Sequence, residues 1–166
     1  MRTFCKQEFE EAGLCGDFAQ ASVSFNKEPG TLRALHFQSH PYMEDRLVRC
    51  ISGAVFDVAV DIRPGSKTFG KWHASELTSK NGLQLYIPKG FAHGFQTLTA
   101  ETIVSYQMAV AFKPELTSGI RWNDPEIDVD WPRTPTNQSP RDLSLPFLAD
   151  IDQSYLMRYP ASGAAE

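Results

Sequence analysis

The chain has 166 residues, of which 42% are hydrophobic and 22% are charged, and its formal net charge is −4. This length suits one domain with a core of its own, so a single domain over residues 1–166 is predicted. The acidic balance, without any run of basic residues, argues against nucleic acid as a partner.

The cysteines and the hydropathy pattern indicate in which cellular compartment the protein is expected. The three cysteines Cys5, Cys15 and Cys50 are odd in number and form no C-x-x-C pair, which argues against a disulfide framework and a thiolate zinc site. The sequence contains no apolar run near the roughly 20 residues that cross a bilayer, and the N-terminus lacks a secretory pattern. We therefore expect a cytoplasmic protein with no membrane partner.

The first predicted element is a short helix. Between Phe4 and Leu14, apolar Phe9 and Ala12 stand among glutamates, and Gly13 comes directly after Ala12. Because glycine commonly ends helices, we expect the helix to stop there.

Alternating patterns follow. In residues 54–62, Phe56, Val58, Val60 and Ile62 fall on one face, which predicts a half-buried strand. Similar runs predict strands at Ser22–Phe25, Leu32–Phe37, Leu47–Ile51, Gln84–Ile87 and Thr102–Ala109. Many short strands separated by Gly and Pro turns indicate a barrel or a sandwich.

The last third of the chain is rich in proline. Residues 131–140 are expected to form an extended strap over the surface. After the strap, Ser139 stands where an N-cap belongs, Pro140 at the first helical position and Asp142 three residues after the cap, so a short helix is predicted to begin here.

The first chemical candidate is His36, three residues after Arg33 in an otherwise apolar strand. A histidine here can be a general base, or a buried side chain satisfied by a backbone carbonyl. The catalytic interpretation requires an orienting acid, a partner across the substrate and a cation where negative charge develops.

The turn Pro88-x-Gly90-x-x-His93 is typical of the second sequence signature of cupin barrels. Metal-binding cupins add a His-x-His pair and a glutamate, because residues two apart on a strand can share an ion. In this chain His36 and His40 are four apart, followed by Glu44. We therefore predict no metal, with a metal-dependent cupin oxygenase as an alternative.

Several ordered segments together resemble the dTDP-4-dehydrorhamnose 3,5-epimerase family of deoxysugar biosynthesis. They are residues 30–38, 47–50, 55–63, 87–95 and 122–125. The resemblance implies an all-β jelly-roll cupin barrel with a few short peripheral helices. It also implies a homodimer that uses no cofactor and binds a nucleotide sugar.

The resemblance implies three catalytic residues. His36 corresponds to the base, Asp142 to its partner carboxylate, and Tyr106 to the proton donor on the opposite face of the sugar. The alternatives are a helix-capping acid at Asp142 and a barrel tyrosine with its hydroxyl at the rim at Tyr106. Substrate-binding positions correspond to Arg33, Arg46, Gln20, His93 and Arg141.

The chain departs from the family pattern at several positions. Arg46 stands where a lysine is usual near the keto oxygen; a guanidinium can stabilise an enolate but hardly donates a proton to it. Thr117 replaces a glutamate, residues 111–112 replace a tyrosine-rich pair, and Arg2 falls where a substrate-contacting glutamate is common. The chain begins at what resembles the second half of the family's N-terminal region, part of which family members use at the dimer interface. We therefore expect altered dimer contacts.

The implied activity is inversion of C3 and C5 of a nucleoside-diphosphate 4-keto-6-deoxyhexose by proton abstraction and reprotonation. The departures keep two alternatives open: a single-site 3- or 5-epimerase acting on another nucleotide-linked keto sugar, and a non-catalytic cupin that binds a sugar nucleotide.

Overall fold

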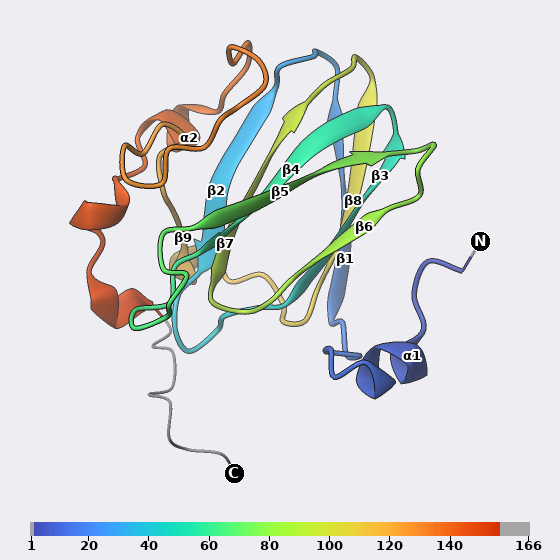
Figure 1. Ribbon diagram of the computed structural model, residues 1–166, viewed down its shortest axis with the longest axis horizontal. Coiled ribbons are helices and arrows are strands. Elements are labelled where there is room, and N and C mark those ends of the chain that lie inside the picture. The colour runs from blue at the N-terminus through green and yellow to red at the C-terminus, as the bar shows by residue number, and fades with distance from the viewer. Residues whose placement is uncertain (1, 157–166) are drawn as a thin grey trace.

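Two antiparallel sheets form the layers of a barrel (Figure 1). The structure, a computed structural model, describes residues 2–156. One sheet has the strand order β1-β8-β3-β6 and the other β5-β4-β7-β2-β9. The predicted all-β class is confirmed. The strands are β1 Gln20–Asn26, β2 Leu32–Gln38, β3 Arg46–Ser52, β4 Ala54–Asp61, β5 Trp72–Thr78, β6 Gln84–Ile87, β7 Phe91–Thr97, β8 Thr102–Met108 and β9 Thr117–Gly119.

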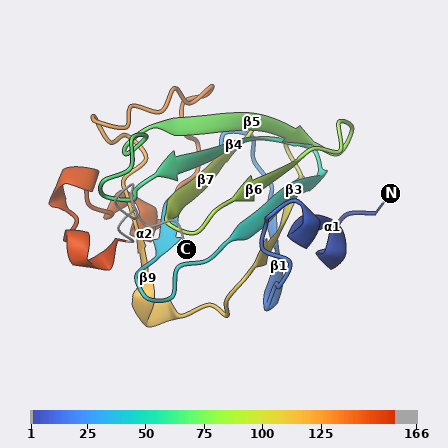
Figure 2. The ribbon, with the colours of Figure 1, turned by 60° about the horizontal axis from the view of Figure 1, so that its bottom comes forward.

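The helices are short and peripheral, as predicted. Figure 2 shows α1 and the segment around α2 on opposite sides of the barrel. In the described part of the chain, no helix has the length and apolar character needed to cross a membrane. The helices are α1 Lys6–Glu11, α2 Pro140–Leu143 and three single 3-10 turns, η1 Pro114–Leu116, η2 Leu148–Asp150 and η3 Gln153–Tyr155.

Local signals explain where α1 ends and where α2 begins. The first helix is shorter than predicted, and Gly13 adopts a left-handed φ of 73° just after it, a conformation that ends helices. The second begins as predicted, because the Ser139 side chain accepts a hydrogen bond from the backbone N–H of Asp142.

The prediction of a half-buried strand at residues 54–62 is wrong, because β4 is covered on both faces. Val58 and Val60 pack against residues 120–156, which follow β9, in a cluster that includes Ile127. On the opposite face, Val55 and Ala59 pack between the two sheets. The face that the sequence pattern assigned to solvent therefore lies between the two sheets, while the predicted apolar face is covered by residues that follow β9.

A bulge in β2 determines which side chains reach the space between the sheets. Arg33 pairs with Phe95 and His36 with His93, so the register shifts by one residue between the two pairs. Residues three apart on a regular strand project to opposite faces. The bulge instead brings Arg33 and His36 to the same cavity.

The bulge requires a close backbone approach from β7. A Cβ atom added at Gly94 would lie 2.8 Å from the carbonyl oxygen of Arg33 and 2.9 Å from the Cα of Ala34. Only glycine fits there without a backbone shift. The glycine that follows His93 therefore supports the placement of the residues opposite it.

Candidate active site

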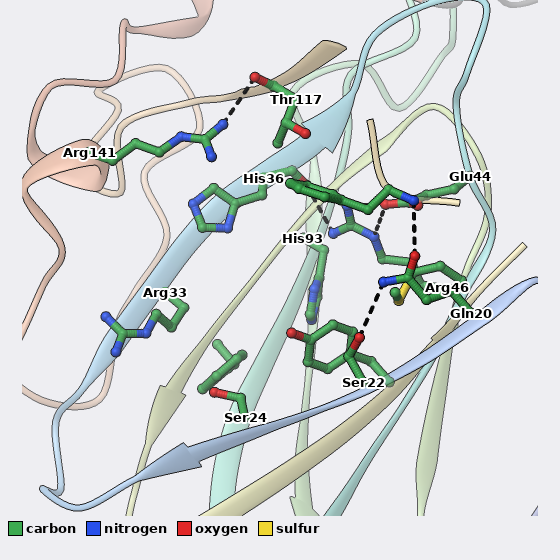
Figure 3. Close-up of a pocket in the computed structure, with 14 residues that line it drawn as sticks. Gln20, Ser22, Ser24, Arg33, His36, Glu44, Arg46, His93, Thr117 and Arg141 are labelled. Atoms are coloured by element: carbon green, nitrogen blue, oxygen red, sulfur yellow. Dashed lines mark hydrogen bonds and ion pairs between the residues drawn. The ribbon is translucent and has the colours of Figure 1, made fainter. Parts of the chain in front are cut away.

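A cavity of about 420 Å³ lies between the two sheets and receives side chains from both (Figure 3). His36, Tyr106 and all five predicted substrate-binding residues line it, and Asp142 contacts it through His36. The structure therefore brings together all eight predicted site residues. The lining residues are Gln20, Ser22, Ser24, Arg33, His36, Glu44, Arg46, His93, Phe95, Tyr106, Met108, Phe112, Thr117 and Arg141.

His36 and Asp142 form a close pair, although 106 positions separate them in the sequence. The distance from His36 Nε2 to Asp142 Oδ1 is 2.7 Å, and the side chains are 28% and 5% exposed. The carboxylate is presented by α2, whose start is held by the Ser139 cap. An imidazole at the cavity wall thus has a buried acid behind it.

Electrostatics keep this acid ionised. Burial alone would raise the pKa of Asp142, but the hydrogen bond and charge of His36, with smaller contributions from Ser139 and Arg33, hold it below its ordinary value. An ionised carboxylate can only accept, so Nε2 of His36 carries a hydrogen, and when the ring carries a single hydrogen its free lone pair is on Nδ1. A general base requires such a lone pair.

Tyr106 faces this pair from the other layer. It lies on β8 between Ser22 of β1 and Val48 of β3, and its ring packs against the core between the sheets. His36, in contrast, lies on β2 in the five-stranded sheet. A ligand in the cavity would therefore have the imidazole and the phenol on different sides.

Two further arginines, Arg33 and Arg141, line the cavity. Among the described residues, neither Arg33 nor Arg141 has a carboxylate within ion-pair distance, and Arg141 donates only to the backbone oxygen of Thr117, at 3.0 Å. Guanidinium groups of this kind suit phosphate oxygens. Arg46, by comparison, is paired with Glu44.

A second histidine and acid pair also borders the cavity. His93 Nε2 lies 2.9 Å from Oδ1 of the fully buried Asp57. The sequence analysis missed Asp57, although a lone acid inside an apolar strand is a signal for a buried partner. It also missed Ser22 and Ser24, which continue the period-two polar pattern of Gln20 along β1.

Of the three residues considered for a metal, His40 lies away from the other two. His36 and Glu44 line the cavity, whereas His40 is exposed in the loop after β2. In residues 2–156 no group of three or more His, Cys, Asp or Glu side chains is placed to hold a metal ion.

Comparison with known proteins identifies the family. The family model described as dTDP-4-dehydrorhamnose 3,5-epimerase matches residues 1–150. The chain belongs to this family. Membership confirms the resemblance and places the chain among the epimerases, which are isomerases.

Individual relatives agree with this assignment. The chain is 54% identical over 133 residues to dTDP-4-dehydrorhamnose 3,5-epimerase of Escherichia coli, covering 80% of this chain and 71% of the relative. A dTDP-6-deoxy-D-glucose-3,5-epimerase of Legionella pneumophila, solved with dTDP-4-keto-L-rhamnose, superposes with a TM-score of 0.91 and is 41% identical, covering 96% and 85% of the two chains. The predicted cupin fold is confirmed.

A relative with narrower specificity is also similar. A 3′-monoepimerase of Streptomyces bikiniensis, solved with dTDP-quinovose, has a TM-score of 0.83 and 29% identity, covering 89% of this chain and 75% of its own. The same barrel therefore carries both double-site and single-site epimerases.

Proposed function

We propose that this protein epimerises a nucleoside-diphosphate 4-keto-6-deoxyhexose at C3 and C5 without a cofactor, with a dTDP-linked sugar as substrate. The observation that carries the proposal is the 2.7 Å pair of His36 and Asp142 on one wall of a cavity with Tyr106 on the other. The relative solved with dTDP-4-keto-L-rhamnose supports the choice of nucleotide sugar.

The proposed chemistry begins with the acidity of hydrogens next to a carbonyl. The C4 keto group of the sugar acidifies the hydrogens at C3 and C5, and Nδ1 of His36 removes one of them. Asp142 stabilises the imidazolium that forms. Tyr106 then delivers a proton to the other face of the carbon, which inverts it. General acid and base groups of this kind contribute about 10²- to 10⁴-fold in rate.

Binding and charge stabilisation are assigned to the other cavity residues. Arg33 and Arg141, which have no carboxylate within ion-pair distance among the described residues, would hold the diphosphate. Arg46 would stabilise the enolate oxygen, and Gln20 and His93 would contact the sugar nucleotide. In this scheme the nucleotide end provides binding energy and the sugar end lies between base and acid.

We also propose that residues 1–166 form one domain and that the protein is a cytoplasmic homodimer. Val23, Phe25 and Ile51 of the four-stranded sheet are 62%, 53% and 45% exposed, which supports an interface on this sheet. Light scattering should give the mass of a dimer at micromolar concentration. A monomer would contradict this part of the proposal.

Solvent deuterium incorporation tests the activity. The protein is incubated in heavy water with dTDP-4-keto-6-deoxysugars, and the label is located by NMR and mass spectrometry. Label at both C3 and C5 is expected. Label at a single carbon would instead favour the single-site epimerase, an alternative supported by the monoepimerase relative and by Phe112 and Thr117 in the cavity wall.

A matched variant separates catalysis from binding. His36→Ala should abolish the exchange while calorimetry shows nearly unchanged affinity for dTDP. If the wild-type protein binds the sugars but exchanges no hydrogen, the non-catalytic binding protein is the better explanation. Activity that disappears with a chelator and returns with a stoichiometric metal would favour the oxygenase alternative.

A further inference from the structure

We propose that Glu44 is a positioning residue, which holds the Arg46 guanidinium where it stabilises the negative charge that develops on the substrate's carbonyl oxygen. The inference rests on the proposed function, because Arg46 has this task only if a keto sugar occupies the cavity. It concerns a residue that the sequence analysis considered only as a metal ligand.

The first support is the number of contacts that hold Arg46 (Figure 3). Its Nε donates to Glu44 Oε1 at 2.7 Å, and a terminal nitrogen contacts the same oxygen. The other terminal nitrogen donates to the backbone carbonyl of His36 at 3.2 Å. All three guanidinium nitrogens are therefore engaged, and one contact ties the group to the backbone of the proposed base.

The second support is the anchoring of Glu44 itself. Gln38 Nε2 donates to Glu44 Oε2 at 3.0 Å, and Gln38 Oε1 accepts from the backbone N–H of Lys113 at 2.8 Å. The residues Gln38 and Glu44 are only 3% and 9% exposed. A chain of hydrogen bonds thus runs from a backbone amide to the guanidinium, with both intermediate side chains buried.

This arrangement leaves Arg46 able to bind a ligand. A guanidinium has five N–H groups, and the contacts with Glu44 and His36 use one on each nitrogen. One N–H on each terminal nitrogen remains. Because the guanidinium keeps its proton, it offers fixed donors to an oxyanion, and donors that are already oriented need no reorganisation when charge develops.

The charge balance indicates which kinetic constant depends on Glu44. The pair of Glu44 and Arg46 is neutral as a whole, whereas neither Arg33 nor Arg141 has a carboxylate within ion-pair distance among the described residues. Arg33 and Arg141 therefore attract the substrate's diphosphate. Loss of Glu44 should release the Arg46 guanidinium from its orientation and lower kcat, with little effect on KM.

The test is a set of variants assayed for deuterium exchange and epimerisation of a dTDP-4-keto-6-deoxysugar. Glu44→Gln, which keeps the shape and removes the charge, should lower kcat about 10- to 100-fold with KM within about twofold of wild type. Asp45→Asn is the matched control. This neighbouring acid accepts hydrogen bonds from the Tyr86 hydroxyl and the Lys89 N–H and does not line the cavity, so its removal should leave kcat unchanged.

A double-mutant comparison distinguishes positioning from a merely structural role. Arg46→Met should lower kcat about 10²- to 10³-fold, and adding Glu44→Gln to it should cause no further loss. Glu44→Asp, which keeps the charge but shortens the reach, should also lower kcat, and it tests the inference if the glutamine variant does not fold.

Three results would overturn the inference. They are wild-type kcat in both Glu44 variants, a rise in KM in place of the fall in kcat, and losses that multiply in the double variant. An inactive wild-type protein would overturn the proposed function and this inference together. Exchange that is present in wild type and absent in His36→Ala shows that the proposed function holds, so a failure at Glu44 would then concern Glu44 alone.

Discussion

Replacing Asp142 by Asn changes the charge behind His36 while keeping its shape. The backbone of Asp142 is held by the Ser139 cap, which uses the main-chain N–H and does not depend on the carboxylate. The side chain is 5% exposed and contacts the imidazole. The variant should therefore fold normally, with an Asn amide group beside His36.

The size of the effect follows from the geometry. Two unit charges 2.7 Å apart interact by about 6 kcal/mol at an effective dielectric constant of about 20. This energy stabilises the imidazolium only after His36 has taken a proton, so its loss raises the barrier. About 6 kcal/mol corresponds to roughly 10⁴-fold in rate. Since His36 is 28% exposed, solvent weakens the interaction, and we expect kcat to fall about 10²- to 10⁴-fold.

Deuterium exchange at C3 and C5 measures this loss directly, and calorimetry with dTDP checks that binding is kept. Asp152→Asn is a suitable control, because it also removes one carboxylate at the start of a short helical turn but Asp152 is not among the cavity residues. An Asp142→Asn protein with kcat within about threefold of wild type would refute the role of the charge, since a contribution of even 1.4 kcal/mol is tenfold in rate.

Three further predictions concern the acid, the fold and the bulge. Tyr106→Phe should still exchange the hydrogen removed by His36 but invert its carbon about 10²- to 10⁴-fold more slowly; NMR of the product would contradict this if inversion kept pace with exchange. Burial would raise the pKa of Asp61, but hydrogen bonds from Arg63, Ser66 and Thr68 lower it to about 2 from 3.8. The lowered pKa means that about 2 kcal/mol of stability is present above about pH 4 and is lost as the pH falls towards 2. Denaturant titrations should show this loss in wild type and not in Asp61→Asn, and equal acid slopes would argue against it. Gly94→Ala should cost about 1 to 3 kcal/mol, because its Cβ would meet the β2 backbone; kcat should fall with it, and a variant with normal thermal stability and kcat would show that the close approach does not matter.

Most strands could be predicted because each carries its own local pattern. The prediction at Gln84–Ile87 agrees with β6, and the one at Leu32–Phe37 differs from β2 by one residue. The sequence analysis listed no strand run at β5, β7 or β9. β9 is three residues long, too short for a period to appear. In β5 the apolar residues change from even to odd positions at Leu77, and β7 is buried at nearly every position, so neither shows one continuous alternation.

Site residues could be predicted as a set, whereas their contacts could not. The resemblance supplied eight residues that the fold brings together at one cavity. The spacing of Arg33 and His36 predicts opposite faces of a regular strand, and only the bulge places them side by side. Asp57 and Glu44 emerged as partners of His93 and Arg46 only in the structure. Asp57 is 36 positions from His93, and Glu44 lies outside any strand, in the loop before β3, so no local period indicates either pair.

The sequence by itself determined the class of structure and the chemical groups available. Alternation, turn residues and the Ser139 cap act over a few neighbours, and such signals can be read one segment at a time. Only the tertiary structure decided which faces are buried, where β2 bulges, and that an acid at position 142 lies behind an imidazole at position 36. These features depend on contacts between segments up to 106 residues apart, and such contacts exist only once the sheets and the residues after β9 have packed together.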